Sequence, residues 1–303
     1  MPINFIPEFW ADAVQMPFET DLVFGQAKVA NRKYEGTISQ KGDTVHVSTL
    51  GDPTVRTYDK NTDLEVEDLD DDESAMVIDQ GDYFAFRVND VDKAQAQVNF
   101  EDPATNRAGY KLQNKVDLFL YGLLKAGVLA GNRLGRVTVC NVEPEKATVG
   151  QLSMYHVAVL LREKLDRADL PKIGRYLALP PELLSPLLLD KRFISADKLG
   201  ATPNTPLLNG TVGRMAGFDL LESNNILKVG GTGANKDDFE IVAGISDALS
   251  FANQISEVET IRDPKRFADQ VRGLNIYGGK VFRPEALASA SVLLADPVAP
   301  VTP

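Results

Sequence analysis

The longest helical pattern in the chain covers residues 102–131, where apolar side chains recur every three or four positions. The apolar stripe consists of Ala108, Leu112, Val116, Phe119, Leu120 and Leu123. Asp102 is a suitable N-cap, and Pro103 fits the first helical position, where its missing N–H has no intrahelical partner. Gly131-Asn132 is a plausible C-cap. At 1.5 Å per residue this helix is about 40–45 Å long, which predicts the spine of an elongated domain.

Residues 41–88 instead alternate between apolar and polar positions, as β-strands do. The pattern predicts a strand over 44–50, a return strand over 75–80, a turn at Gly81-Asp82 and another strand over 83–88. These strands form a long hairpin that projects just before the predicted spine helix and brings the chain back to it. Because an isolated hairpin is marginally stable in water, the excursion is expected to be supported by another subunit.

The connection between these strands carries eight acids and no base over residues 63–73. A calcium loop requires a central glycine, and no glycine lies in this range, so that interpretation fails. A solvated loop remains one interpretation. The other is a charged surface that meets Lys or Arg side chains of a partner.

Residues 1–40 have the composition of an arm, with Trp10, the sole tryptophan, and four phenylalanines, including Phe18. One interpretation is a terminal segment that packs on its own core. The alternative is an arm whose aromatic anchors dock on a neighbouring chain, because termini are usually loose unless they are tied down.

The remainder of the chain mixes helices and strands, so the fold class is α+β. We expect a strand rich in β-branched residues at 136–142 and a helix that opens with a Thr148-x-x-Gln151 capping box and ends near Arg167. The later expected elements are a buried strand at 175–180, a short helix from Pro181, extended pieces within 207–226, and strands within 239–251, 257–262 and 275–282.

Composition excludes several classes of protein. The chain has 303 residues and a formal net charge of −11, which argues against a sequence-reading DNA-binding protein with a basic face. A single cysteine, Cys140, excludes an internal disulfide framework and fits a reducing compartment. The first residues lack the features of a signal peptide, and no run of 18 apolar residues predicts a transmembrane helix.

Candidate chemistry is sparse, and we expect no enzyme, no metal and no cofactor. The two histidines, His46 and His156, lie on different elements without metal-ligand spacing, and Cys140 in a β-branched strand is expected to be a buried, inert thiol. The glycine-rich stretch 230–236 lacks the G-K-[ST] of a phosphate loop. A remote alternative is a cytosolic hydrolase with a scattered site near His156 and Asp166.

The order of arm, long hairpin, long helix and mixed α/β region resembles the major capsid proteins of tailed bacteriophages. The stretches that resemble that family are Val29–Gly36 followed by Gly42–Val45, Leu208–Asp219, Asp247–Ala252, Glu257–Glu259 and Tyr277–Ala286. The resemblance covers about residues 1–295, and the order and spacing of the motifs carry it.

The resemblance implies a division of the chain into five parts. Residues 1–40 form the N-terminal arm and 41–88 the extended loop, a β-hairpin that lies over a neighbouring subunit. Residues 89–142 hold the spine helix and peripheral domain, 143–270 the mixed α/β axial domain, and 271–303 the closing strands of the peripheral domain and the tail.

The resemblance also implies a function. The chain is expected to assemble in the host cytoplasm into hexamers and pentamers of an icosahedral capsid, and so to reside in the virion around packaged double-stranded DNA. Its partners are then itself, a portal and a separate scaffolding protein, since the chain begins directly at the arm without a long charged leader. The candidate subunit-contact residues are Trp10, Phe18, Tyr58, Lys60, Asp70, Asp71, Asp72 and Glu73.

Two alternatives concern that function. Some relatives crosslink an extended-loop lysine to an asparagine of the next subunit, but no motif surrounds Lys60 that would carry this chemistry to it, and we expect no crosslink there. An encapsulin-type compartment would use the same fold to package an enzyme instead of DNA.

Overall fold

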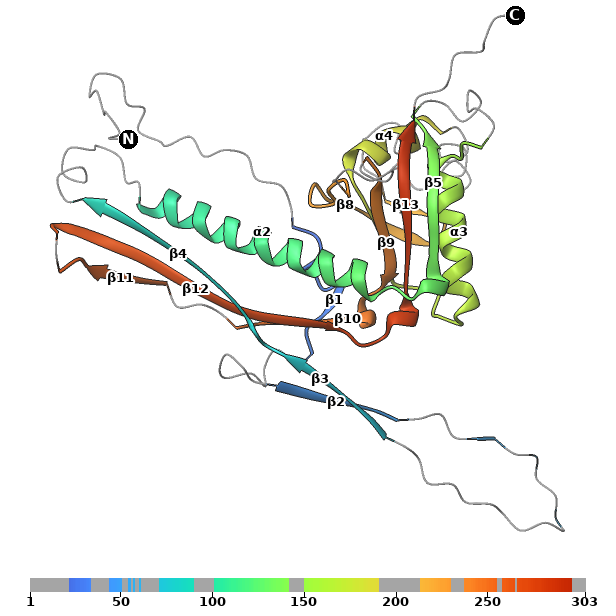
Figure 1. Cartoon of the computed structure of the whole chain (residues 1–303), viewed down its shortest axis with the longest axis horizontal. Helices are drawn as coiled ribbons and strands as arrows, with labels where there is room; N and C mark the ends of the chain where they lie inside the picture. The colour runs from blue at the N-terminus through green and yellow to red at the C-terminus, as the bar shows by residue number, and fades with distance from the viewer. Residues whose placement is uncertain are drawn as a thin grey trace, which may run out of the picture.

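The chain is elongated, with a compact α/β body at one end of a long helix and a hairpin that stands away from both (Figure 1). The computed structural model describes residues 22–33, 44–50, 54–55, 57, 60, 71–89, 101–141, 150–190, 213–229, 237–254, 258–264 and 266–295. Within them the strands form a five-stranded, a six-stranded and a two-stranded sheet. The mixture of helices and strands confirms the predicted α+β class.

The predicted spine is α2 (Glu101–Gly127), 27 residues that extend about 40 Å. It ends at Gly127, four residues earlier than the sequence predicts. A Cβ atom at Gly127 would lie 2.7 Å from Val281, so the helix meets a strand at this point and leaves no room for a side chain. A short 3-10 turn, η2 (Ala130–Asn132), follows, and the Arg133 guanidinium donates to the carbonyls of Lys125, Ala126 and Val128 at the helix end.

The five-stranded sheet is built around its longest strand, β12 (Ala268–Val281). On one edge β12 pairs antiparallel with β10 (Leu249–Gln254) and β11 (Val258–Arg262), and on the other edge with β4 (Gln80–Asn89). The short β1 (Ala30–Asn31) pairs in parallel with β10. Spine residues Val116, Leu120 and Leu124 share one core with residues of β10 and β12, so the second half of the helix packs against these late strands.

The six-stranded sheet has the order β5-β13-β9-β6-β8-β7. Its strands are β5 (Arg133–Cys140), β6 (Arg175–Leu179), β7 (Arg214–Met215), β8 (Phe218–Glu222), β9 (Phe239–Ile245) and β13 (Leu287–Ala295). Helix α3 (Met154–Arg167) packs on β5 and β13, and α4 (Pro181–Leu189) contacts α3 (Figure 1). Every residue of β6 is buried, as its unbroken apolar run predicts.

The predicted capping box is wrong. Helix α3 begins at Met154, and its N-cap is Ser153, whose hydroxyl accepts a hydrogen bond from the His156 backbone N–H at 3.2 Å. Gln151 lies before the helix because the next residue, Leu152, forms a β-bridge with Val139 and so belongs to the edge of the sheet.

The sheets divide the chain differently from the ranges expected for its parts. Strands β5 and β13 lie in the six-stranded sheet, although the ranges 89–142 and 271–303 were assigned to the peripheral domain. Strands β10 and β11 lie in the spine sheet, although they fall within 143–270. Strands of the two sheets therefore alternate along the sequence. The assignment of each sheet to the peripheral or the axial domain stays a prediction.

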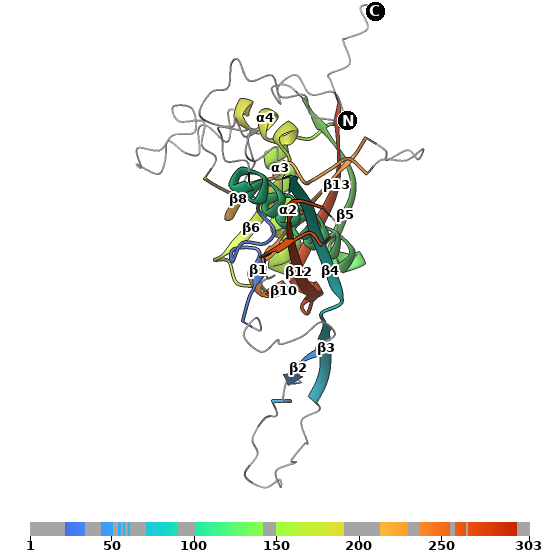
Figure 2. The same ribbon diagram turned by 90° about the vertical axis from the view of Figure 1, so that its left-hand side faces the viewer.

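The two-stranded sheet is the excursion, with β2 (Thr44–Leu50) antiparallel to β3 (Asp71–Val77). No turn forms at Gly81-Asp82, contrary to the prediction. Instead β4 begins at Gln80, and only Ile78 and Asp79 separate it from β3. Both views show the β2–β3 hairpin pointing away from the body (Figures 1 and 2).

Candidate subunit-contact surfaces

The base of the hairpin is fixed where β3 crosses β12. Lys280 of β12 donates from Nζ to the Ser74 hydroxyl and to the Ala75 carbonyl, each at 2.8 Å. A Cβ atom at Gly278 would lie 2.7 Å from the Val77 carbonyl oxygen, so the two backbones approach as closely as glycine permits. Met76 and Ile78 are buried here together with Ala252. The hairpin therefore leaves the body from a rigid base.

A second contact holds the spine helix on the sheet. The Lys115 ammonium of α2 bonds Asp82 Oδ1 of β4, and the Tyr277 hydroxyl of β12 donates to Asp82 Oδ2 at 2.7 Å. Burial raises the pKa of Asp82, but the hydrogen bonds from Lys115 and Tyr277 and the lysine charge together lower it below its ordinary value. The Tyr277 ring also packs edge-on to Phe119 of α2, with ring centroids 5.4 Å apart.

Asp117 connects three separate segments at the middle of the spine. Its side chain is 1% exposed. Oδ1 accepts hydrogen bonds from the backbone N–H groups of Phe24 at 2.6 Å and Gly25 at 3.3 Å, and Oδ2 accepts from Asn225 Nδ2 at 2.8 Å. Burial raises the pKa of this carboxyl, since its hydrogen bonds from neutral donors compensate only part of the desolvation.

The spine is also attached to the six-stranded sheet through β9. The Tyr121 hydroxyl donates to the Glu240 carbonyl at 2.7 Å, and Lys125 Nζ lies 2.8 Å from Glu240 Oε2. Together with the Asp117–Asn225 hydrogen bond, these contacts fix the orientation of the α/β body relative to the spine.

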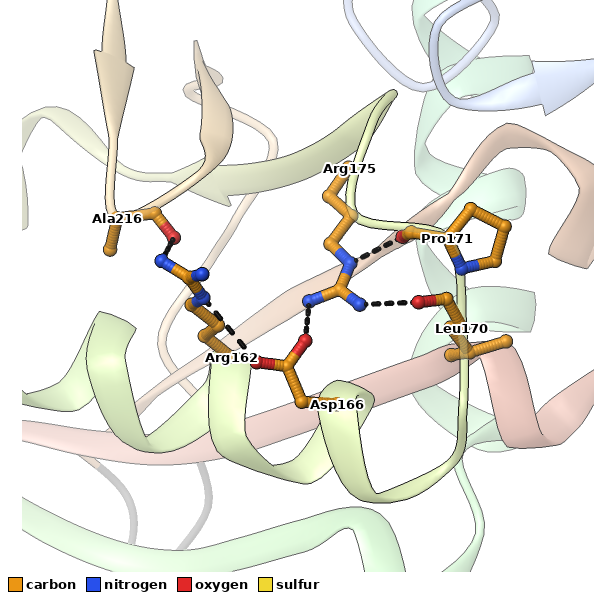
Figure 3. A network of polar contacts seen from close by, with 6 residues as sticks. All are labelled: Arg162, Asp166, Leu170, Pro171, Arg175 and Ala216. Atoms are coloured by element: carbon orange, nitrogen blue, oxygen red, sulfur yellow. Dashed lines mark hydrogen bonds and ion pairs between the residues drawn. The ribbon is translucent and has the colours of Figure 1, made fainter.

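Inside the body, a buried arginine organises one end of the six-stranded sheet (Figure 3). Arg175 donates to Asp166 Oδ1 at 2.6 Å, to the Pro171 carbonyl at 2.7 Å and to the Leu170 carbonyl at 2.8 Å. Arg162 shares the same carboxylate and donates to the Ala216 carbonyl at 3.3 Å. The hydrogen bond and charge of Arg175 hold the pKa of Asp166 below its ordinary value.

This network contradicts the hydrolase site considered from the sequence. Asp166 is ion-paired to two arginines, and His156 lies ten residues earlier on α3, a separation of about 15 Å along the helix axis. The two side chains therefore cannot act as a dyad. Cys140 is buried, as predicted. The described residues hold no cluster of His, Cys, Asp and Glu that could bind a metal ion.

The contact residues predicted from the sequence lie mainly on the hairpin. Asp71, Asp72 and Glu73 are the first residues of β3 and pair with Leu50, Thr49 and Ser48 of β2. Lys60 is exposed in the connection between the strands. Trp10, Phe18, Tyr58 and Asp70 lie outside the described residues. Their roles as subunit contacts stay predictions.

Sequence reasoning missed the joints described above. Asp117, Asn225 and Arg175 are polar residues within or beside apolar patterns, and a pattern cannot show which distant backbone groups such side chains reach. The one available signal was the position of Asp117 on the otherwise apolar side of the spine, since a carboxylate there requires hydrogen-bond donors.

Comparison with known proteins gives the fold an independent basis. No protein-family model and no curated protein matches the sequence. Solved structures do match. One from Mycobacterium phage Che8 has 28% identity and a TM-score of 0.71, with 95% of this chain and 97% of that chain covered. The capsid structure of cyanophage P-SCSP1u has 16% identity and a TM-score of 0.72, with 95% and 93% covered.

A third match is the mature capsid of bacteriophage PhiM1, with 14% identity, a TM-score of 0.69, and 96% and 93% of the two chains covered. The alignments span nearly all of both chains, so the whole architecture is shared. The predicted resemblance to the tailed-phage capsid fold is confirmed. Of the helices in the described residues, none is long and apolar enough to cross a membrane.

Proposed function

We propose that the chain is a major capsid protein of the tailed-phage type and that it assembles into the hexamers and pentamers of a closed icosahedral shell around double-stranded DNA. Its chemistry is that of a structural protein. Each subunit presents the same surfaces, and repeated heterologous contacts close into rings and then into a shell.

The observation that carries this proposal is the hairpin that projects away from the body of its own subunit. In the described residues β2 pairs only with β3, and the body holds the hairpin only at its base, through Lys280, Met76 and Ile78. A two-stranded hairpin without further packing is marginal in water. Support from a neighbouring subunit explains why the chain maintains such an extension.

The arm, which precedes the hairpin in the sequence, supports the same assembly. Residues Val23–Ala30 are held on the spine by Asp117 and by the buried side chain of Phe24, so the chain that precedes them starts from a fixed point. We expect Trp10 and Phe18 to dock on an adjacent subunit, because large aromatic side chains are common anchors of protein interfaces. Lys60 and Tyr58 are expected to contact a neighbour through the hairpin.

The remaining partners follow from the shell. A separate scaffolding protein would guide assembly, a portal would occupy one vertex, and the packaged DNA would be enclosed without sequence-specific contacts. The net charge of −11 suits such a container, since a largely acidic surface does not bind phosphate groups strongly.

The experiment is expression of the chain with the other head proteins of its genome, followed by rate-zonal sedimentation and negative-stain electron microscopy. Rapidly sedimenting, uniform closed particles are the expected result. As a control, a variant with residues 51–70 replaced by a short turn should remain soluble and folded by circular dichroism but fail to form particles. If the unaltered chain stays monomeric under every condition, the proposal is wrong.

A further inference from the structure

A cavity of about 230 Å³ lies where the described part of the arm meets the spine helix and β10. Its walls come from all three elements and include Leu22 and Arg32 of the arm, Gln113 and Val116 of α2, and Phe251 of β10. The side chains of Val116 and Phe251 are buried. An apolar cavity of about 150 Å³ already holds a benzene molecule, so one aromatic side chain fits in this space.

The mouth of the cavity carries a cation. Asp117 also borders the space, but its oxygens already accept hydrogen bonds from the arm backbone and from Asn225. Arg32 is exposed, its guanidinium lies 5.4 Å from the centre of the Phe251 ring, and its Nη2 donates to the Gly25 carbonyl at 3.0 Å. Apolar walls with an arginine at the mouth suit an aromatic group that has an acid beside it.

The charges of the arm change sign at residue 22. Residues 1–21, which lie outside the described residues, hold four acids and no Lys or Arg, whereas residues 22–33 hold three bases and no acid. Two of these bases, Lys28 and Arg32, are exposed and have no acidic partner among the described residues. In a chain of net charge −11, the segment beside the cavity is therefore basic, and it attracts the acidic segment that precedes it.

The aromatic residue that precedes the cavity most closely along the chain is Phe18. It stands four residues before Leu22, which lines the cavity, and four extended residues span at most about 14 Å. Glu19 follows Phe18 directly, and Asp21 precedes Leu22. The ring can therefore enter the cavity while an adjacent carboxylate reaches Arg32.

We propose that, in the unassembled subunit, this cavity holds the Phe18 ring of its own arm, with Glu19 on Arg32. The tether of four residues gives Phe18 a high effective concentration at its own cavity, so the arm of the same chain occupies it in preference to that of a second copy. The ring packs against Val116 and Phe251, and the Arg32 guanidinium gains a second aromatic neighbour. An arm held in this way does not dock on an adjacent subunit. Its release during assembly is the part of the inference that rests on the proposed function.

The test is a variant of the unassembled subunit with a single tryptophan in a new place. Trp10 is the only tryptophan, so Trp10→Phe/Phe18→Trp puts the one fluorophore at the proposed contact. Its emission should be shifted to the blue relative to the same chain unfolded in urea, and acrylamide should quench it several times less. Both values should be independent of subunit concentration, since the contact lies within one chain. Emission typical of exposed tryptophan, or shielding that appears only as the concentration rises, would overturn the proposal.

Two further changes test the cavity rather than the arm. Gly25 lies at its edge, and a Cβ atom there would have Arg32 Nη2 as its nearest neighbour at 4.0 Å, so Gly25→Leu fills space beside the arginine. In the reporter chain, Gly25→Leu and Arg32→Glu should each raise acrylamide quenching to the level of the unfolded chain. Because Arg32 is exposed, the Arg32→Glu chain stays folded, and it decides the matter if Gly25→Leu does not fold.

The matched control changes a charge elsewhere on the spine helix. Lys111 is exposed and stands two residues before Gln113, which places it about 200° around the helix axis from that cavity residue. Lys111→Glu should leave the quenching unchanged. Quenching that responds equally to Lys111→Glu and to Arg32→Glu, or to neither, would show that Phe18 does not occupy this cavity.

The fluorescence measurement does not depend on assembly. Shielded emission in a subunit that forms no particles would support the cavity contact and reject the shell function, whereas exposed emission in a subunit that does form particles would reject the contact and leave the shell function standing. Particle formation tests the release of the arm. Gly25→Leu frees the arm in advance, so its particles should appear after a shorter lag than those of the unaltered chain, and an equal or longer lag would contradict a cavity that holds the arm back.

Discussion

Asn225 donates a hydrogen bond to Asp117 across 108 residues of sequence, with 2.8 Å between Nδ2 and Oδ2. Asn225 follows β8 in the six-stranded sheet, and Asp117 lies in the middle of the spine helix. The other carboxylate oxygen binds the backbone of Phe24 and Gly25, where the arm begins. One buried side chain thus fixes the positions of arm, spine and α/β body, and this joint has measurable consequences.

Asp117→Leu should destabilise the unassembled subunit by about 3–5 kcal/mol. The change leaves three donors without their acceptor in a buried site, and each such loss costs about 1–3 kcal/mol. Urea denaturation followed by circular dichroism measures it. Lys111→Leu on the exposed side of the same helix is the control and should change stability by less than about 0.5 kcal/mol. If the two variants lost the same stability, the structural role assigned to Asp117 would be wrong.

The same carboxyl predicts a pH dependence of stability. Because burial raises the pKa of Asp117, the folded chain binds this proton more tightly than the unfolded chain, whose aspartate has its ordinary pKa of 3.8. Stability contributed by this group therefore rises as pH falls through the raised pKa towards 3.8. The unfolding free energy of the unaltered chain minus that of Asp117→Asn should increase on acidification. A flat or falling difference would contradict the assigned environment.

Asp82 predicts a pH dependence of stability with the opposite sign. Its folded pKa is lowered, so its ion pair with Lys115 stabilises the fold above pH 3.8 and is lost as pH falls through the lowered value. The stability difference between the unaltered chain and Lys115→Met should shrink on acidification. Matched thermal unfolding series across acidic buffers measure this difference, and a constant value would show that the pair contributes nothing.

Glycines on the spine and on β12 should respond in opposite directions. Gly278→Ala places a Cβ atom 2.7 Å from the Val77 carbonyl and 2.9 Å from Ile78 Cα, both backbone atoms, and should cost about 1–3 kcal/mol. Gly122→Ala in α2 meets nothing within 4 Å and should stabilise the subunit by about 0.5–1 kcal/mol. Thermal unfolding of both variants decides the matter, and a neutral Gly278→Ala would contradict the tight crossing of β3.

The acidic strand start is a test of assembly rather than of folding. Changing Asp70, Asp71 and Asp72 to Asn and Glu73 to Gln should reduce particle yield while the subunit unfolds at an unchanged midpoint. One exposed ion pair contributes about 0–1 kcal/mol, but a shell repeats the contact in every subunit. Particles formed in normal yield and of normal stability would show that these acids meet water only.

The elements in which apolar residues recur at a regular spacing could be predicted from the sequence. The spine helix, the hairpin and the buried strand β6 each follow from a period of apolar residues and from the breakers around it. Their order, compared with a known family, also indicated the overall architecture, which the solved phage capsids confirm.

The parts of the structure that the sequence did not predict depend on contacts between residues that are far apart in the sequence. The spine ends at Gly127, where Val281 leaves no room for a side chain, and α3 begins at Met154 because Leu152 joins the edge of β5. Likewise, each sheet combines strands that lie far apart in the sequence, so no linear division of the chain reproduces the sheets. Propensity and capping signals describe neighbours along the chain, whereas these boundaries are set by tertiary packing.

The central claim is that this subunit builds a closed shell in which each hairpin lies on the next subunit. Cryo-electron microscopy of the purified particles tests it most directly. We expect an icosahedral reconstruction with hexamers and pentamers, in which the hairpin of one subunit lies over its neighbour. An open or irregular assembly, or a closed shell in which each hairpin folds back on its own subunit, would contradict this account.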